Sequence, residues 1–259
     1  MSDSLDPAGS EDTFISHLVE LRSRLVRAAI AVIVVFLCLM PFAGHIYDYL
    51  AHPMMVALPD GAKMIATGVI TPFLVPVKVT MLVAFLIALP WVLYQLWAFV
   101  APGLYAHEKK LIAPLVVSSS MLFLIGVAFC YFFVFGVIFR FINNFAPASV
   151  SVAPDIDSYF DFVMTMFIAF GLTFEVPIVV IVLVRMGLVS VEKLRQIRPY
   201  VIVGAFVLAA VVTPPDVMSQ LLLAVPLCLL YEIGLLVAPI FAHATRSPDT
   251  EETVGEEAA

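Results

Sequence analysis

Two glutamates lie inside strongly apolar stretches, where a charged side chain carries a clear physical cost. Glu175 is in the segment FGLTFEVP that ends at Pro177, and Glu232 lies within a later apolar run. A carboxylate in lipid costs at least a few kcal/mol, so it normally faces a partner or a wet cavity. For Glu175 we favour a polar patch for a bound partner or a protonation site. The alternative is a neutral glutamic acid that hydrogen-bonds a backbone carbonyl left without its donor by Pro177. For Glu232 both interpretations stay open.

Two other glutamates flank apolar segments. Glu20 lies in a stretch where leucines recur at helical spacing, and Glu108 precedes two lysines after a Pro-Gly turn. A fixed carboxylate can accept two parallel hydrogen bonds from a guanidinium. The alternatives are an i, i+4 pair of Glu20 with Arg24 and a helix-terminal role for Glu108. On the pattern alone, these structural alternatives are favoured.

Motifs of soluble enzymes are absent from the sequence. His107-Glu108 is not followed by a second histidine three residues later, and neither a GxSxG nor a Walker A motif is present. The three cysteines, Cys38, Cys130 and Cys228, each lie in an apolar run, which is typical of buried small side chains. No basic stripe suggests nucleic acid. The sequence therefore predicts no catalytic residues, no metal site and no cofactor.

Six apolar segments must position these residues. Hydrophobic residues form 63% of the 259-residue chain, and its mean hydropathy is +1.08. The runs are continuous rather than alternating, which favours membrane helices over strands. We predict an all-α membrane protein with six transmembrane helices, at about 25–43, 73–100, 111–139, 159–184, 199–212 and 217–238.

Basic residues predict the orientation of these helices. If the N-terminus is cytoplasmic, ten of the 13 lysines and arginines lie on the cytoplasmic side, which satisfies the positive-inside rule. Both termini are then cytoplasmic. Nine of the 20 acidic residues are in the two ends of the chain. We expect flexible acidic tails at 1–13 and 244–259 around one membrane domain at 14–243. The acidic leader does not resemble a cleaved signal peptide.

The connections and prolines give further expectations. We expect loops at 44–72 and 143–158, with Asp155 or Ser158 as the N-cap of the fourth helix and Asp216 as the N-cap of the sixth. The fifth and sixth helices look short, and the third looks long enough to tilt. Prolines within the spans favour kinks and a concave wall of helices.

Seven ordered motifs make the chain resemble the TatC family, the multi-spanning subunit of the twin-arginine protein translocase. They are HLVELRSRL (17–25), TPF (71–73), YQLWAFVAP (94–102), LYAHE (104–108), FGLTFEVP (170–177), RPY (198–200) and LAAVVTPPD (208–216). The resemblance implies a receptor for paired-arginine signal peptides and a core subunit of a translocase that exports folded proteins with the proton-motive force. It places the chain in the bacterial inner membrane within an oligomeric complex.

The resemblance also implies residue roles. The signal-peptide-binding residues would be Glu20, Glu108, Arg22, Phe99 and Leu104. Thr213 and Gln220 would contact single-span TatA/TatB-type subunits, and Glu175 matches the family's intramembrane glutamate. Further positions that match functionally sensitive residues are Pro53, Tyr131 and Asp216.

An alternative function is a proton-coupled small-solute carrier that uses Glu175 as its proton site. Carriers commonly consist of repeated halves, and no such repeat is visible in the sequence. An intramembrane enzyme is disfavoured by the missing nucleophile and metal motifs.

Overall fold

The computed structural model describes residues 8–58, 63–100, 112–145, 153–213 and 216–242. Within these ranges every regular element is a helix, and the single β-bridge joins Ile65 to Asp155. The chain divides into two compact units, residues 1–168 and 169–259. Five helical stretches are long and apolar enough to cross a membrane, and a shorter apolar helix spans Arg198–Val212. The prediction of an all-α multi-pass membrane protein is therefore confirmed.

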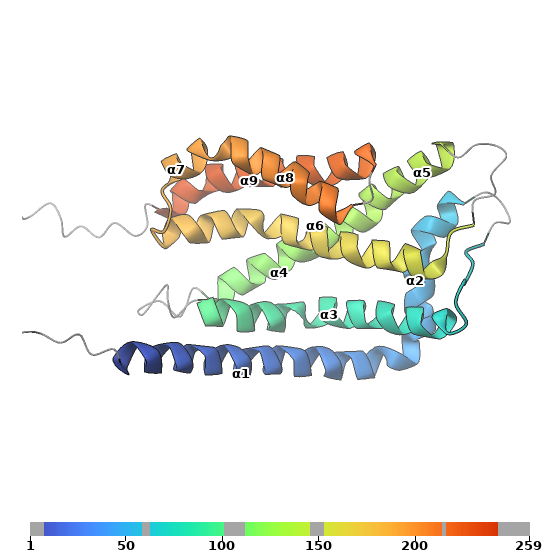
Figure 1. The fold of residues 1–259 in the computed structure, drawn as a ribbon, viewed down its shortest axis with the longest axis horizontal. Coiled ribbons are helices and arrows are strands. Elements are labelled where there is room, and N and C mark those ends of the chain that lie inside the picture. Colours follow the sequence, from blue (N-terminus) through green and yellow to red (C-terminus); the bar gives the residue numbers. More distant parts are fainter. Residues whose placement is uncertain (1–7, 59–62, 101–111, 146–152, 214–215, 243–259) are drawn as a thin grey trace, which may run out of the picture. The chain divides into compact units, whose positions relative to one another are not determined.

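The first helix of unit 1 is interrupted by a proline. Helix α1 (Ala8–Leu39) ends at a 3-10 turn, η1 (Met40–Phe42), and α2 (Ala43–Ala57) follows directly. Pro41 lies in that turn, where its missing N–H and its ring oppose a continuous α-helix. Figure 1 shows α2 turning across the end of α1 and past the start of α3. The expectation of a loop from residue 44 was wrong, because the chain turns at η1 and stays helical through α2.

The other helices of unit 1 pack beside α1. Helix α3 (Thr71–Val100) runs antiparallel to it (Figure 1). Helices α4 (Ile112–Phe129) and α5 (Phe135–Phe145) are joined by a π-helical turn, η4 (Cys130–Val134). In this core the Phe135 ring stacks on the rings of Phe139 and Phe167, and Phe139 meets the Phe162 ring edge to face. The third segment is thus one long helical stretch, interrupted by a π-turn of the kind often found at functional sites.

Helix α6 (Ile156–Arg185) contains the boundary between the two units. Asp155 caps it, because its Oδ2 accepts a hydrogen bond from the Ser158 N–H at 3.2 Å. The N-cap expected at Asp155 is confirmed. Ile65, within the connection between α2 and α3, pairs with Asp155, and Oδ1 of the same carboxylate accepts hydrogen bonds from Thr67. One side chain therefore both begins α6 and fixes that connection.

Unit 2 contains the rest of α6 and helices α7 (Val191–Gln196), α8 (Arg198–Val212) and α9 (Val217–Ala242). Its apolar core contains Val180, Leu194, Tyr231, Leu235 and Ala238. Gly234 allows a close approach of α9 to α6, since a Cβ there would lie 3.1 Å from the Pro177 Cα. The Tyr231 hydroxyl donates to the Leu194 carbonyl oxygen at 2.8 Å. These contacts hold α6 and α7 against α9.

Several boundaries differ from the sequence prediction. Helix α1 begins at Ala8, inside the stretch expected as a tail, and the short helix α7 was not predicted. The fifth span is short as expected, because 15 residues at about 1.5 Å each give about 22 Å. The sixth is longer than expected, with 26 helical residues, because Gln220 and Glu232 find partners within unit 2 and do not end it. The curvature of the whole wall stays a prediction.

Candidate functional site

Glu20 is held by its neighbour one helical turn away. Its Oε1 accepts hydrogen bonds from Arg24 Nε at 2.8 Å and from Arg24 Nη2 at 2.6 Å. The Glu20 side chain remains 39% exposed, and that of Arg24 is 20% exposed. The i, i+4 pair expected from the sequence is therefore present. Both bonds use the same carboxylate oxygen, and the Glu20 side chain stays partly exposed.

A ring stack brings the beginning of α1 against the end of α3. His17 and Phe99 stack with ring centroids 4.3 Å apart and an interplanar angle of 22°. Trp97 Nε1 in turn donates to Ser119 Oγ at 3.0 Å, which links the same end of α3 to α4. Glu20, one turn after His17, therefore lies at the end of unit 1 where residues 101–111 connect α3 to α4.

The structure describes only two of the other four residues predicted to bind the signal peptide. Arg22 is exposed on α1, and Phe99 is half-buried under His17. Glu108 and Leu104 lie outside the described residues. The structure thus brings Glu20 and Phe99 to one end of the bundle, and the pairing of Glu20 with Glu108 stays a prediction.

The two glutamates in apolar segments have different environments. Glu175 is buried in α6, with 8% of its surface exposed. Glu232 is half-exposed and accepts a hydrogen bond from Arg198 Nη2 at 2.6 Å, which forms an ion pair between α9 and the start of α8. A cation 34 residues away in sequence thereby gives Glu232 a structural role. For Glu175 the polar or protonation role stays a prediction.

The α8–α9 hairpin uses its polar side chains internally. The buried Thr213 hydroxyl donates to the Ala209 carbonyl oxygen at 2.8 Å, and Gln220 Nε2 donates to the Phe206 carbonyl oxygen at 3.1 Å. Asp216 Oδ1 accepts from the Ser219 N–H at 2.7 Å and so caps α9, as the sequence predicts. The Gln220 amide N–H is thus engaged within the hairpin.

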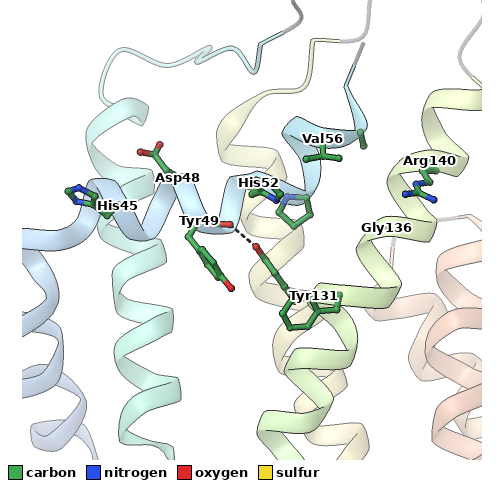
Figure 2. Close-up of a pocket in the computed structure, with 11 residues that line it drawn as sticks. His45, Asp48, Tyr49, His52, Val56, Tyr131, Gly136 and Arg140 are labelled. Carbon is green, nitrogen blue, oxygen red and sulfur yellow. Dashed lines mark hydrogen bonds between the residues drawn. The ribbon is translucent and has the colours of Figure 1, made fainter. Parts of the chain in front are cut away.

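Pro53 and Tyr131 are linked through the backbone carbonyl of Tyr49. Because Pro53 has no N–H, it cannot donate to the carbonyl of Tyr49 four residues earlier. The Tyr131 hydroxyl, from the π-helical turn, donates to that carbonyl oxygen at 2.8 Å (Figure 2). The Tyr49 and Tyr131 rings also stack, with centroids 5.5 Å apart. This arrangement, hereafter the tyrosine clasp, binds α2 to the middle of the third span.

A cavity of about 800 Å³ lies beside the tyrosine clasp, between α2 and the η4–α5 stretch (Figure 2). Pro53 and Tyr131 both line it. Sequence reasoning missed the polar residues that share this lining, because they come from distant segments and form no motif: His45, Asp48, His52 and Arg140. The family resemblance had marked Pro53 and Tyr131, which both line this cavity, but nothing in the sequence indicated that they lie together.

Among the described residues outside the spans, Asp155 has a carboxyl group whose pKa is shifted from its ordinary value. The Ser158 N–H, and after it the Thr67 N–H and hydroxyl, hold the pKa of this carboxyl below its ordinary value, and partial burial opposes them. Hydrogen bonds to the charged form favour ionisation. The described residues contain no group of three histidine, cysteine, aspartate or glutamate side chains arranged to hold a metal.

The long apolar helices of this fold define a multi-pass helical membrane protein. The family described as Sec-independent protein translocase protein (TatC) matches residues 16–226, and the chain belongs to this family of translocase components. The Escherichia coli K12 Sec-independent protein translocase protein TatC is 52% identical over 92% of this chain and 93% of its own length. The protein of that name from Haemophilus influenzae is also 52% identical, over 88% and 89%.

A solved structure extends the likeness to three dimensions. A crystal structure titled as the twin arginine translocase receptor TatC aligns with a TM-score of 0.77 and 38% sequence identity. The alignment covers 89% of this chain and all of that one.

Proposed function

We propose that this protein is the membrane receptor for twin-arginine signal peptides and a core subunit of the translocase that exports folded proteins. The observation that carries the proposal is the half-exposed Glu20 carboxylate, which forms an ion pair with Arg24. It lies at the end of unit 1 where the His17 and Phe99 rings stack. The name of the aligned crystal structure, a twin arginine translocase receptor, supports the same function. The receptor would have no catalytic centre of its own.

Recognition would use charge-assisted hydrogen bonds. Two carboxylates, Glu20 and Glu108, would each receive one guanidinium, and Arg22, Phe99 and Leu104 would complete the surface. Guanidinium groups present a planar fork of donors that an ammonium cannot reproduce, so a lysine pair would fit less well. The second Glu20 oxygen, which Arg24 does not bond, could accept such a donor. The i, i+4 pair contributes only about 0.3–0.5 kcal/mol, so an incoming arginine could also displace Arg24.

The orientation that suits this function follows from the basic residues. Placing both termini in the cytoplasm puts Glu20, the connection 101–111 and α7 on the cytoplasmic side of a bacterial inner membrane. Precursors with signal peptides arrive from that side. The ten basic residues on this side support the orientation.

Partner subunits and energy supply complete the proposal. Single-span TatA/TatB-type subunits would contact the α8–α9 hairpin near Thr213 and Gln220, where α8 is too short for a bilayer core of about 30 Å and the membrane must thin. Export would use the proton-motive force without ATP hydrolysis by this chain. Glu175, buried in α6, would serve as the polar intramembrane contact.

Crosslinking tests the receptor function. The purified full-length protein is exposed to a photoreactive twin-arginine signal peptide and to the same peptide with both arginines changed to lysine. We expect the arginine peptide to be captured at least tenfold more strongly, with crosslinks near Glu20 and Phe99. Equal capture of both peptides would refute recognition of the arginine pair.

A further inference from the structure

The cavity between α2 and α5 lies at the opposite end of α1 from Glu20 and is not explained by peptide recognition. It has a volume of about 800 Å³, and its walls come from α2 on one side and from η4 and α5 on the other. All of these elements belong to unit 1. Arg140 lies two residues before the end of the apolar span Ile112–Ile142, so the cavity is at the level of the lipid headgroups.

The walls of this cavity are fixed by hydrogen bonds. The tyrosine clasp joins α2 to η4, and the Tyr159 hydroxyl donates to the Leu50 carbonyl oxygen at 2.9 Å. Tyr159 is buried, and so are Leu50 and Ala51 on the packed face of α2. A site with walls held in this way does not need to be ordered by its ligand, which lowers the entropic cost of binding.

Two donors line the cavity from different helices. Figure 2 shows His52 on α2 and Arg140 on α5, and Asp48, which also lines the cavity, on the other side of α2 from the Tyr49 ring. Within the described part of the chain, neither Arg140 nor His52 has a hydrogen bond or ion pair. A guanidinium always carries a charge, and a neutral imidazole still carries one N–H donor. The pair therefore suits an anion with several acceptor oxygens.

The rest of the lining is apolar and reaches the surface of the spans. Phe132 is 75% exposed and Val56 is 66% exposed, and both line the cavity. Gly136 leaves room, because a Cβ built there would meet no atom within 4 Å. A ligand with an anionic head and a hydrocarbon tail could place the head between the donors and the tail along these side chains.

We propose that this cavity binds a membrane phospholipid, with its phosphodiester between Arg140 and His52 and an acyl chain along Phe132 and Val56. The choice of a phospholipid rests on charge complementarity, because Arg140, which has no hydrogen-bond or ion-pair partner among the described residues, lies where the bilayer supplies phosphates. A bound lipid would brace α2 against the third span. The proposal requires only a multi-pass membrane protein, so its failure would leave the receptor function untouched.

Native mass spectrometry of the delipidated full-length protein in detergent tests the site. The probes are dioctanoyl phosphatidylethanolamine, dioctanoylglycerol, which lacks the phosphate, and inorganic phosphate. We expect the phospholipid to bind the wild type at least tenfold more tightly than either other probe. Arg140→Gln should weaken it at least tenfold, and Arg140→Lys should weaken it less.

Filling the cavity provides a test that leaves the donors in place. Gly136→Leu should abolish the phospholipid adduct without lowering the melting temperature. Gly44→Leu is the matched control, because its Cβ also meets no atom within 4 Å and Gly44 does not line the cavity. If Gly136→Leu does not fold, the Arg140 variants decide the matter.

Three outcomes would overturn the proposal. Phospholipid binding by Gly136→Leu or Arg140→Gln at wild-type strength would place the lipid elsewhere. Equal binding of dioctanoylglycerol would remove the role of the phosphate. Tight binding of inorganic phosphate would make this a phosphate site without a lipid.

Discussion

The Tyr131 hydroxyl donates to the carbonyl oxygen of Tyr49, the acceptor that Pro53 leaves without its usual helical donor. The two tyrosines are 82 residues apart in sequence and meet because η1 turns α2 across the end of unit 1. Pro53 and Tyr131, which the family resemblance marked separately, are therefore linked through the same Tyr49 carbonyl oxygen.

Tyr131→Phe should destabilise the protein by about 1 kcal/mol, because it leaves the Tyr49 carbonyl unsatisfied. The melting temperature in detergent should fall by about 2–4 °C. In a Pro53→Ala background the backbone N–H of residue 53 can donate to Tyr49 instead. The loss on Tyr131→Phe should then be less than half as large, and equal losses in both backgrounds would contradict the clasp.

Glu20→Gln should weaken capture of a twin-arginine signal peptide about tenfold or more, because a charge-assisted hydrogen bond to a guanidinium becomes a neutral one. Capture is measured by photocrosslinking at several peptide concentrations. The amount of protein in the membrane should not change.

Glu192→Gln is the matched control for this change, since Glu192 is also an exposed glutamate on a helix, far along the chain in α7. It should capture the peptide like the wild type. If Glu20→Gln captured the peptide as well as Glu192→Gln and the wild type, Glu20 would be excluded from recognition. Loss of the Glu20→Gln protein from the membrane would indicate a topological role.

Glu232→Gln and Arg198→Gln should each lower stability by about 0.5–1 kcal/mol, because the ion pair between them is only half-buried. The double variant should lose about as much as either single variant, since both remove the same interaction. Thermal unfolding measures all three. A Glu232→Gln protein with an unchanged melting temperature but no export would instead indicate a functional role for this carboxylate.

Asp155 should make stability depend on acid pH. Its folded-state pKa lies below the ordinary value of 3.8, so its hydrogen bonds stabilise the fold fully above that pH. The contribution is lost as the pH falls through the lower folded pKa. The melting temperatures of wild type and Asp155→Asn should therefore differ most at neutral pH and converge in acid.

Thr67→Val tests the same carboxylate from its partner's side. It removes the hydroxyl donor but keeps the backbone donor of residue 67, so its pH-dependent difference should have the same sign and be smaller. A difference between wild type and Asp155→Asn that stays constant from neutral pH to acid would contradict this account.

Glu175→Gln should retain more export activity than Glu175→Leu, because a buried amide keeps hydrogen-bonding atoms that an alkyl side chain lacks. Export of a twin-arginine reporter is compared at equal membrane levels of the three proteins. Export at the wild-type level by Glu175→Leu would exclude a polar role for this residue.

The sequence by itself determined the features that depend on local chemistry. Continuous apolar runs specify helices in lipid, because only internal hydrogen bonding satisfies the backbone there. Asp155 and Asp216 cap the helices that follow them, since an N-cap involves residues only three positions apart. The shared motifs indicated the family, which the comparison with known proteins then established.

The tertiary structure decided which distant side chains meet. The partners of Tyr131, Glu232 and Trp97 lie 82, 34 and 22 residues away, and no local pattern selects them. The contacts depend on how each helix is rotated about its axis and where η1 turns the chain. Hydropathy cannot specify these quantities, because lipid accepts an apolar helix in any rotation, whereas a side-chain hydrogen bond requires one.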